Sequence, residues 1–421
     1  MKSLSILLSF CLFSYHLSAQ GGNKRFSFAK MYVGADFNYI SNYGESQFLN
    51  SNNELETFTR NAYVNPSINI GATHFWGFAD FYVSIPTTNI QTKANTVKTN
   101  TNFGVFTGLR IYPLQLTDYK LRPFVGYKFS PFRYAQANID EISNKKTGIK
   151  SVLDAGFGYR LPNAYFYLGY NYIVNNDLST YISRTDQINT TVPKHFFNLG
   201  VNFLFETTKM SDNSINRYLD EVLSTSNQDG LFFGIGPSAA FQIGSSSYLE
   251  EYYPFLDDKT MANTFVDLSI GYHFTKTDIV TSLAFRPITQ KREAFNFSQK
   301  INRNSFTLEA YKVLGDYHGF SPYVGGGVSY ERLRLREEDN GILITDLSDN
   351  KIAPVVTFGW DIRPSKKGDF WVLRTNLRYT PTLDFEHNNY AMDLDHLEFN
   401  FIQFVFYPQR FNVFKKYMNR K

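Results

Sequence analysis

The stretch Phe196-Phe-Asn-Leu-Gly-Val-Asn-Phe-Leu-Phe205 alternates between large apolar residues and small or polar ones. Its apolar set is Phe197, Leu199, Val201, Phe203 and Phe205, and Asn198, Gly200 and Asn202 lie between them. A period of two places each set on its own face of a β-strand. A tilted strand needs about ten residues to cross a bilayer. The stretch therefore predicts a strand with one face toward lipid and the other toward the inside of a barrel.

The same alternation recurs along most of the chain. In the first half we expect strands near 30–41, 62–74, 77–86, 101–112, 120–134, 147–161, 163–175 and 194–206. In the second half we expect them near 230–243, 263–275, 278–289, 304–314, 320–336, 351–363, 369–383 and 396–408. Most of these segments are longer than the roughly five or six residues usual in globular sheets. The pattern predicts an all-β, transmembrane, antiparallel up-and-down barrel fold with sixteen strands.

The connections between these segments alternate in length. Long polar stretches occupy 42–61, 86–100, 135–146 and 176–193, and short turns lie near 76–77, 113–119 and 161–163. The second half repeats the short turns near 275–277, 315–319 and 364–368. Outer-membrane barrels have short periplasmic turns and longer outside loops. We therefore expect the short turns, and both ends of each half, on the periplasmic side.

The two halves are copies of one unit. Met31-Tyr-Val-Gly34 returns as Leu231-Phe-Phe-Gly234, and Arg122-Pro-Phe-Val-Gly126 returns as Ser321-Pro-Tyr-Val-Gly325. The offsets are 200 residues for the first pair (231 minus 31) and 199 for the second (321 minus 122). Solenoids repeat every 20 to 50 residues or so, whereas this period is the size of a domain. The sequence thus contains a duplicated domain-sized unit.

Extending the strand register turns charged and aromatic side chains inward. In the first copy the inward charges are Asp36, Asp80, Arg110, Arg122, Lys128, Asp154 and Arg160, and the inward aromatics are Tyr63, Phe78, Tyr82, Phe124, Tyr165 and Tyr167. In the second copy the inward set is Asp267, Arg286, Glu309, Glu331, Asp361, Arg363, Arg374, Arg378 and His273. Buried charges need partners of opposite sign. We therefore expect the inward charges of each copy to form ion pairs within that copy, with Arg363 as the partner of Asp361.

An eight-stranded barrel fills its interior with side chains, whereas a sixteen-stranded barrel leaves a channel. The inward aromatics and the near-balanced charges favour two tandem eight-stranded barrels. One sixteen-stranded barrel is the alternative.

The ends of the chain and the junction between the copies differ from the barrel segments. Residues 1–19 read as a secretory signal peptide that takes Cys11, the chain's one cysteine, with it. We expect barrel unit 1 at 20–206 and barrel unit 2 at 230–408. Between them, 207–229 reads as a periplasmic linker with a short helix near 214–223, and 409–421 reads as a basic-aromatic periplasmic tail. An amphipathic stretch of this kind is typical of a segment that lies on a membrane surface.

Chemistry-bearing motifs are few. The formal dinucleotide match at 234–239 lies inside an expected strand instead of at a strand-to-helix turn. The last outer loop and the following strand carry an acid and imidazole cluster, comprising Asp384, Glu386, His387, Asp393, Asp395, His396 and Glu398. Such groups can bind a cation or activate water, but their spacing fits no defined ligand set. We interpret the cluster as solvated loop chemistry that assembly does not need, and we predict no catalytic, cofactor or metal site.

A run of alternating arginines ends the strand expected at 320–336. If the register of Val328 and Tyr330 persists, Arg332, Arg334 and Arg336 face outward at the level of the lipid head groups. Guanidinium groups suit phosphate. The pattern predicts contact with an anionic glycolipid.

The repeated Arg/Ser-Pro-Phe/Tyr-Val-Gly strands, the Gly-aromatic alternation and the Ala19/Gln20 cleavage point resemble the outer-membrane β-barrel domain proteins of Bacteroidota. That group is similar to the OmpA/OmpX-type small barrels. The resemblance covers 30–206 and 230–408. It implies an eight-stranded unit without shared catalytic residues.

The chain is therefore expected in the cell outer membrane as a non-enzymatic protein with a structural or partner-docking role in the envelope. A small-solute channel or secretion-associated pore is the alternative, and a membrane hydrolase or acyltransferase is the second alternative. The expected partners are outer-membrane lipid, the barrel-assembly machinery and a periplasmic protein bound through linker or tail. No nucleic acid and no cofactor are expected.

Overall fold

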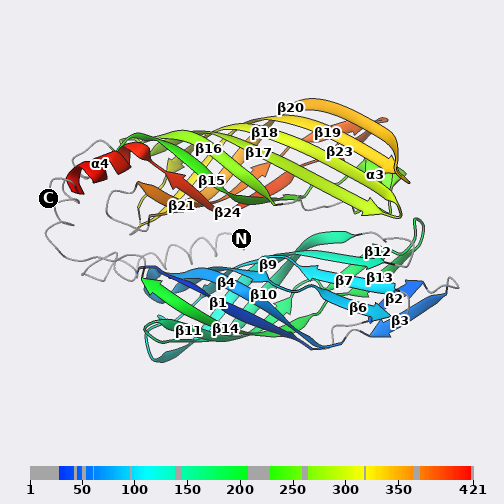
Figure 1. The fold of residues 1–421 in the computed structure, drawn as a ribbon, viewed down its shortest axis with the longest axis horizontal. Coiled ribbons are helices and arrows are strands. Elements are labelled where there is room, and N and C mark those ends of the chain that lie inside the picture. The colour runs from blue at the N-terminus through cyan, green and yellow to red at the C-terminus, as the bar shows by residue number, and fades with distance from the viewer. Residues whose placement is uncertain are drawn as a thin grey trace, which may run out of the picture.

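The structure is a computed structural model, and it describes residues 28–41, 45–49, 54–59, 61–94, 97–137, 145–206, 228–257, 264–316, 319–363 and 370–418. The expected signal peptide at 1–19 and the expected linker helix near 214–223 lie outside these residues. The described chain forms two β-structures that lie side by side with their long axes roughly parallel (Figure 1). None of the described helices is long and apolar enough to cross a membrane.

The second half forms a closed barrel of eight antiparallel strands. Its wall runs β15-β16-β17-β18-β19-β20-β21-β24, and pairing of β24 with β15 closes it. The bounds are β15 Gly230–Gln242, β16 Phe265–Phe274, β17 Ile279–Ala294, β18 Phe297–Val313, β19 Phe320–Asp339, β20 Ile342–Ile362, β21 Trp371–Thr380 and β24 His396–Phe406. β17, β18 and β20 extend well past the segments expected from alternation, β19 extends three residues past (339 minus 336), and β20 has 21 residues. Strands of that length reach beyond a bilayer's apolar core.

The first half forms a second ring of eight strands. Its order is β10-β11-β14-β1-β4-β5-β8-β9, and pairing of β9 with β10 completes the ring. The bounds are β1 Lys30–Ile40, β4 Tyr63–His74, β5 Ala79–Pro86, β8 Phe106–Ile111, β9 Lys120–Ala137, β10 Lys146–Arg160, β11 Ala164–Ile173 and β14 His195–Glu206. The prediction of two eight-stranded units is confirmed, and the single sixteen-stranded barrel is excluded.

One expected strand of the first barrel is broken. The segment near 101–112 becomes β7 (Val97–Phe103) and β8, and both pair with β9. The break lies at Gly104, beside Pro131 of β9. Proline has no N–H to donate, so the carbonyl of Gly104 accepts from the Ser130 hydroxyl at 3.1 Å instead. Beyond the break, β7 continues along β9 as far as Ala137 and pairs on its other side with β6 (Ile90–Ala94) in a hairpin.

Long connections gather at one end of each barrel and carry their own structure (Figure 1). The additional hairpins are β2 (Glu45–Leu49) with β3 (Leu55–Thr59), β12 (Asp177–Tyr181) with β13 (Gln187–Thr191), and β22 (Asp384–His387) with β23 (Tyr390–Asp393). Helix α3 (Ser247–Tyr252) lies in the loop after β15. At the opposite end are the turn η2 (Phe75–Gly77) and helix α4 (Pro408–Met418). The alternation of long and short connections holds in the first barrel. In the second barrel it is broken, because β17–β18 and β19–β20 extend through the expected loops and are joined by two-residue turns at 295–296 and 340–341.

Both barrels are polar inside and apolar outside. In β1, Val33 and Phe37 are 45% and 42% exposed, whereas Asp36 is 1% exposed. In β14, Phe203 is 64% exposed and Asn202 is fully buried. A soluble protein would lose free energy by exposing this belt. The arrangement is that of a barrel whose outer face contacts lipid.

Glycines let the inward aromatic rings lie flat against the wall. Tyr32 lies over Gly71, where an added Cβ would meet its hydroxyl at 2.5 Å. Phe232 lies over Gly271, where an added Cβ would meet its ring at 2.5 Å. The two pairs are 200 residues apart, so the duplication preserved one packing unit inside each barrel. Any larger residue at either glycine would displace the ring.

The barrels touch along one side and at their outer ends. On the apolar faces, Phe81 packs against Trp360 with ring centroids 6.0 Å apart, and Phe129 packs against Phe399 at 5.8 Å. At the outer ends, Arg184 of the β12–β13 hairpin pairs with Asp339 at 2.6 Å. Aromatic packing within the belt and an ion pair outside it thus join the two units.

Candidate functional site

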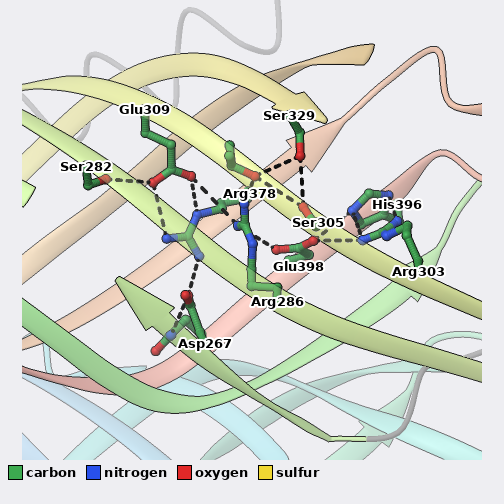
Figure 2. A network of polar contacts seen from close by, with 12 residues as sticks. Asp267, Ser282, Arg286, Arg303, Ser305, Glu309, Ser329, Arg378, His396 and Glu398 are labelled. Atoms are coloured by element: carbon green, nitrogen blue, oxygen red, sulfur yellow. Dashed lines mark hydrogen bonds and ion pairs between the residues drawn. The ribbon is translucent and has the colours of Figure 1, made fainter. Parts of the chain in front are cut away.

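The interior of the second barrel is crossed by arginine side chains that meet carboxylates from other strands. Arg378 of β21 donates to Asp267 of β16 at 2.8 Å and to Glu309 of β18 at 2.6 Å. All three side chains are 3% exposed or less. Figure 2 shows Arg378 between its two partners, with Ser282 donating to Glu309. These contacts bridge the lumen from wall to wall.

A second cluster lies nearer the outer end (Figure 2). Glu398 of β24 accepts from Arg286 at 2.8 Å and from Arg303 at 2.9 Å. Arg303 also contacts both ring nitrogens of His396 at 2.6 Å and lies 3.3 Å from Glu331. Alternation turns Arg286, Arg303 and Glu331 inward, and a bulge in β24 between Asn400 and Gln403 turns His396 and Glu398 inward as well. The cluster fills the lumen with mutually compensating charge.

The part of the same lumen toward the α4 end holds a bidentate pair. Arg374 donates to both oxygens of Asp361, at 2.7 and 2.9 Å. Its guanidinium lies 5.1 Å from the ring centroid of Tyr311. The expectation that Arg363 serves Asp361 is therefore wrong. Arg363 lies one residue beyond the end of β20 and pairs at the rim with Asp316, at 3.5 Å.

The first barrel balances its interior with fewer charges and more tyrosines. Arg110 donates to Asp154 at 2.9 Å and to Asp80 at 3.3 Å. Its guanidinium lies between the rings of Tyr82 and Tyr167, 4.1 and 3.8 Å from their centroids. In the first barrel these tyrosine rings fill part of the lumen. In the second barrel the corresponding space holds further ion pairs. Here too, the charges pair within their own barrel, as expected.

The other inward charges of the first barrel take different positions. The Nζ of Lys128 lies over Phe196, 4.9 Å from the ring centroid. Arg122 is half-buried and donates to the backbone of Gln115, and Arg160 pairs with Asp118 at 2.6 Å. Arg122 and Arg160 therefore lie at the short-turn rim of the barrel, because β9 begins and β10 ends there.

The outer mouth of the second barrel is closed by helix α3. The Ser246 hydroxyl caps the helix by accepting from the N–H of Leu249. Tyr248 reaches down and donates to Glu337 at 2.8 Å, and burial raises the pKa of this phenol. An apolar cluster packs around it, comprising Leu249, Phe255, Leu256, Phe295, Phe297, Leu333, Leu335, Leu383, Phe385, Met392 and Leu394. No sequence pattern predicts this lid, because its residues come from the connections after β15, β17 and β21 and from β18 and β19.

The acid and imidazole cluster predicted at 384–398 is divided by the structure. His396 and Glu398 face the lumen, so their interpretation as solvated loop residues is wrong. Asp395 stays at the loop base, where it accepts from the N–H of Leu383 at 3.0 Å. Asp384 lies 3.8 Å from Lys351, and His387 packs against Tyr248. Among the described residues, no three His, Cys, Asp or Glu side chains are placed to hold a metal ion.

The arginines at the end of β19 face outward, as predicted. Arg334 pairs with Asp346 at 2.7 Å, and Arg336 pairs with Glu338 at 2.6 Å. Arg332 lies over the rings of Phe306 and Tyr330, 5.9 and 5.7 Å from their centroids. These guanidinium groups stand just above the apolar belt. They form the most strongly basic feature of the outward face of β19.

The C-terminal segment is a helix at the end of the second barrel opposite α3. Arg410 of α4 is 5% exposed and donates to Nδ1 of His273 at 2.9 Å and to the carbonyl of Gln228 at 3.0 Å. Phe411 packs against Phe370 with centroids 5.2 Å apart. Lys415 and Lys416 remain exposed. The start of the predicted basic-aromatic tail thus closes one end of the lumen.

No protein-family model matches the chain, and no curated protein matches it. Among solved structures, it is similar to Neisserial surface protein A, with 15% identity, a TM-score of 0.31, and coverage of 42% of this chain and 99% of that one. It is also similar to Ail of Yersinia pestis, solved with the heparin analogue sucrose octasulfate, with 13% identity, a TM-score of 0.26, and coverage of 42% and 96%.

A third similar structure is an outer membrane channel from Pseudomonas putida F1, with 9% identity, a TM-score of 0.21, and coverage of 92% of this chain and 99% of that one. All of these scores are low. The assignment of two barrels therefore rests on the strand pairing and the burial described above.

Proposed function

We propose that the protein is an integral outer-membrane protein whose paired barrels form a rigid, non-conducting anchor that presents a docking surface outside the cell. The observation that carries this proposal is the filled lumen. Arg378 crosses it between Asp267 and Glu309, and α3 and α4 cover its two ends. A solute would have to break buried ion pairs to pass, at a cost of several kcal/mol for each uncompensated charge.

The location follows from membrane physics. Strands can cross a bilayer only as closed barrels, because each backbone N–H and C=O must be paired. Bacterial barrels of this kind belong to the outer membrane, with short turns inside and long loops outside. The signal peptide expected at 1–19 supports the same location.

The docking role is supported by the hairpin between β19 and β20. Its turn, at Asn340 and Gly341, has φ of 49° and 79°, as a tight two-residue hairpin requires. Directly after the turn, Ile342, Leu343 and Ile344 are 69%, 49% and 49% exposed. Consecutive exposed apolar residues at a hairpin tip indicate a contact surface more than a solvated loop.

Planar-bilayer recording of the full protein tests the proposal. We expect no steady conductance above the bare-membrane background, with a general porin as the positive control in the same chamber. Stable openings on the nanosiemens scale would contradict the filled-barrel account and support the channel alternative. A matched variant, Arg378→Gly, removes the side chain that crosses the lumen, and intermittent leakage in this variant alone would locate the seal at Arg378.

The docking surface is tested by site-specific photo-crosslinking on intact cells. A photoreactive residue at Leu343 is expected to give a discrete crosslinked protein product, whereas the same residue at Val356, farther along β20 on the exposed apolar wall, is not. Equal products from both positions would contradict a docking role for the tip.

A further inference from the structure

The outward face of β17 to β20 changes character over a single rung of the strand ladder. One rung joins Phe285, Phe306, Tyr330 and Ile352. The next outward-facing rung joins Pro287, Asn304, Arg332 and Asn350, and the one beyond it joins Thr289, Asn302, Arg334 and Ser348. Ile352 is 73% exposed and, two residues away, Asn350 is also exposed. The boundary between the lipid tails and the head groups therefore falls between the first two rungs.

Arg332 is the cation nearest to that boundary. Among the described residues, it makes no ion pair with a carboxylate, whereas Arg334 is held by Asp346 and Arg336 by Glu338. Its side chain rests on Phe306 and Tyr330 of the apolar rung. A guanidinium on aromatic faces keeps its N–H groups free to donate. Arg332 thus offers a charged donor that the fold itself does not use.

The side chains around Arg332 line a hollow of about 450 Å³. Asn302 and Asn304 lie on one side, and Ser348 and Asn350 lie on the other. The one acid in its lining, Asp349, lies 3.5 Å from Lys351. Amide and hydroxyl donors around an arginine match the several acceptor oxygens of a phosphate group.

We propose that this hollow binds the phosphate of an anionic glycolipid in the outer leaflet, with Arg332 as the main contact and Asn304 and Asn350 as flanking donors. The lipid's acyl chains lie below it, against Phe306, Tyr330 and Ile352. This inference rests on the proposed membrane orientation, which places the rung of Arg332 at the outer head-group level. A headgroup with chains fits better than a free anion, because the rung of Arg332 that lines the hollow is the neighbour of the apolar rung of Phe306, Tyr330 and Ile352.

Native mass spectrometry of the full protein released from detergent micelles tests the proposal. The probes are a bisphosphorylated glucosamine-disaccharide lipid, its dephosphorylated counterpart and inorganic phosphate. The variants are Arg332→Gln and, as a matched control, Lys300→Gln, which removes one positive charge from the same outward face farther from the belt. Heat-modifiable migration on gels first verifies that each variant is folded.

We expect the parent and Lys300→Gln to retain one phosphorylated lipid. We expect Arg332→Gln to bind it about tenfold more weakly, which is the effect of losing one charge-assisted contact. The dephosphorylated lipid and inorganic phosphate should show no retained adduct. Equal binding by Arg332→Gln and the parent would overturn the proposal.

Three other results would also overturn it: equal weakening by both variants, which indicates diffuse charge attraction; retention of the dephosphorylated lipid; or competition by millimolar inorganic phosphate, which indicates a free-anion site. Since the readout is lipid retention by folded protein, it is independent of the conductance result, and either proposal can fail without the other.

Discussion

The first barrel and the second barrel have the same number of strands and the same polar-inside wall, yet they differ in what crosses the lumen. In the first, one guanidinium, that of Arg110, serves two carboxylates and is held between two tyrosine rings. In the second, a chain of arginines and carboxylates extends along most of the interior (Figure 2). A duplicated wall therefore constrains the inward positions less than the outward ones. Contact with lipid requires an apolar belt of side chains on the outer face. The lumen tolerates different sets of side chains, provided that their charges compensate one another.

The largest expected effect comes from removing one buried guanidinium group from the lumen of the second barrel. Arg378→Leu would leave Asp267 and Glu309 buried without their guanidinium partner, and we expect a loss of about 3–5 kcal/mol in the free energy of unfolding. Urea unfolding of the protein in detergent, followed by tryptophan fluorescence, measures it. The matched control, Arg334→Leu, breaks an exposed pair on the outer face and should leave stability nearly unchanged. Equal losses would show that the lumen is not the source of stability.

The corresponding change in the first barrel is expected to be smaller. Arg110→Leu removes the guanidinium from Asp80 and Asp154, but the hydroxyl of Tyr32 still donates to Asp80 at 2.6 Å. We expect a loss of about 2–3 kcal/mol, the magnitude of hydrogen bonds to a charged group. The same urea titration compares the two variants. If Arg110→Leu proves more damaging than Arg378→Leu, then the tyrosines do not compensate charge as proposed.

The shared packing unit should respond equally in both barrels. Gly71→Val would push against Tyr32, and Gly271→Val would push against Phe232, so each variant should lose about 1–3 kcal/mol by overpacking. Gly148→Val in β10 is the control, because an added Cβ meets nothing within 4 Å there. Thermal loss of the heat-modifiable form ranks the three variants. A large loss in one barrel alone would mean that the duplicated pairs no longer have the same role.

The smallest expected effect concerns the outer contact between the barrels. The hydrogen bond from Arg184 lowers the pKa of Asp339 below its ordinary value of 3.8. The pair is therefore intact above pH 4 or so, and its contribution is lost only as the pH falls through the lowered pKa. Both side chains are substantially exposed, so the effect on overall stability is small.

Energy transfer between dyes at Gln187 and Ile342 measures this contact. It should stay constant from pH 7 to about pH 4 and fall below that. Arg184→Gln should lower it at every pH. A fall near pH 6 would point to a histidine instead of this ion pair.

Much of the fold could be predicted from the sequence. Alternation such as that of Phe196–Phe205 located all sixteen wall strands, because lipid on one side and a filled lumen on the other impose a strict period of two. The broken strand at Gly104 was missed, since it depends on Pro131 of a neighbouring strand, which alternation within one segment does not reveal. The lid formed by α3 was missed for a similar reason.

Most of the residues that face the lumen could be predicted from the sequence, but which of them form ion pairs with one another could not. Asp361 and Arg363 are close in sequence, which suggested a pair, yet the barrel places Arg374 across from Asp361 and leaves Arg363 at the rim. Phe404 and Phe406 of β24 face outward, so strict alternation would turn His396 and Glu398 outward too, and only the bulge near Asn400 brings these two side chains into the lumen. Pairing across a lumen depends on strand register and shear, which a single sequence does not specify.

The central claim is that the chain forms two self-contained, filled barrels, and the most direct measurement is the folding of each half alone. Residues 20–206 and residues 230–421, expressed and refolded separately in detergent, should each give a heat-modifiable, protease-resistant species with a single β-sheet circular dichroism spectrum. Each should fold without the other present. If neither half folds alone while the full chain does, or if the two halves fold only when mixed, then the wall is shared and the account of two closed barrels is contradicted.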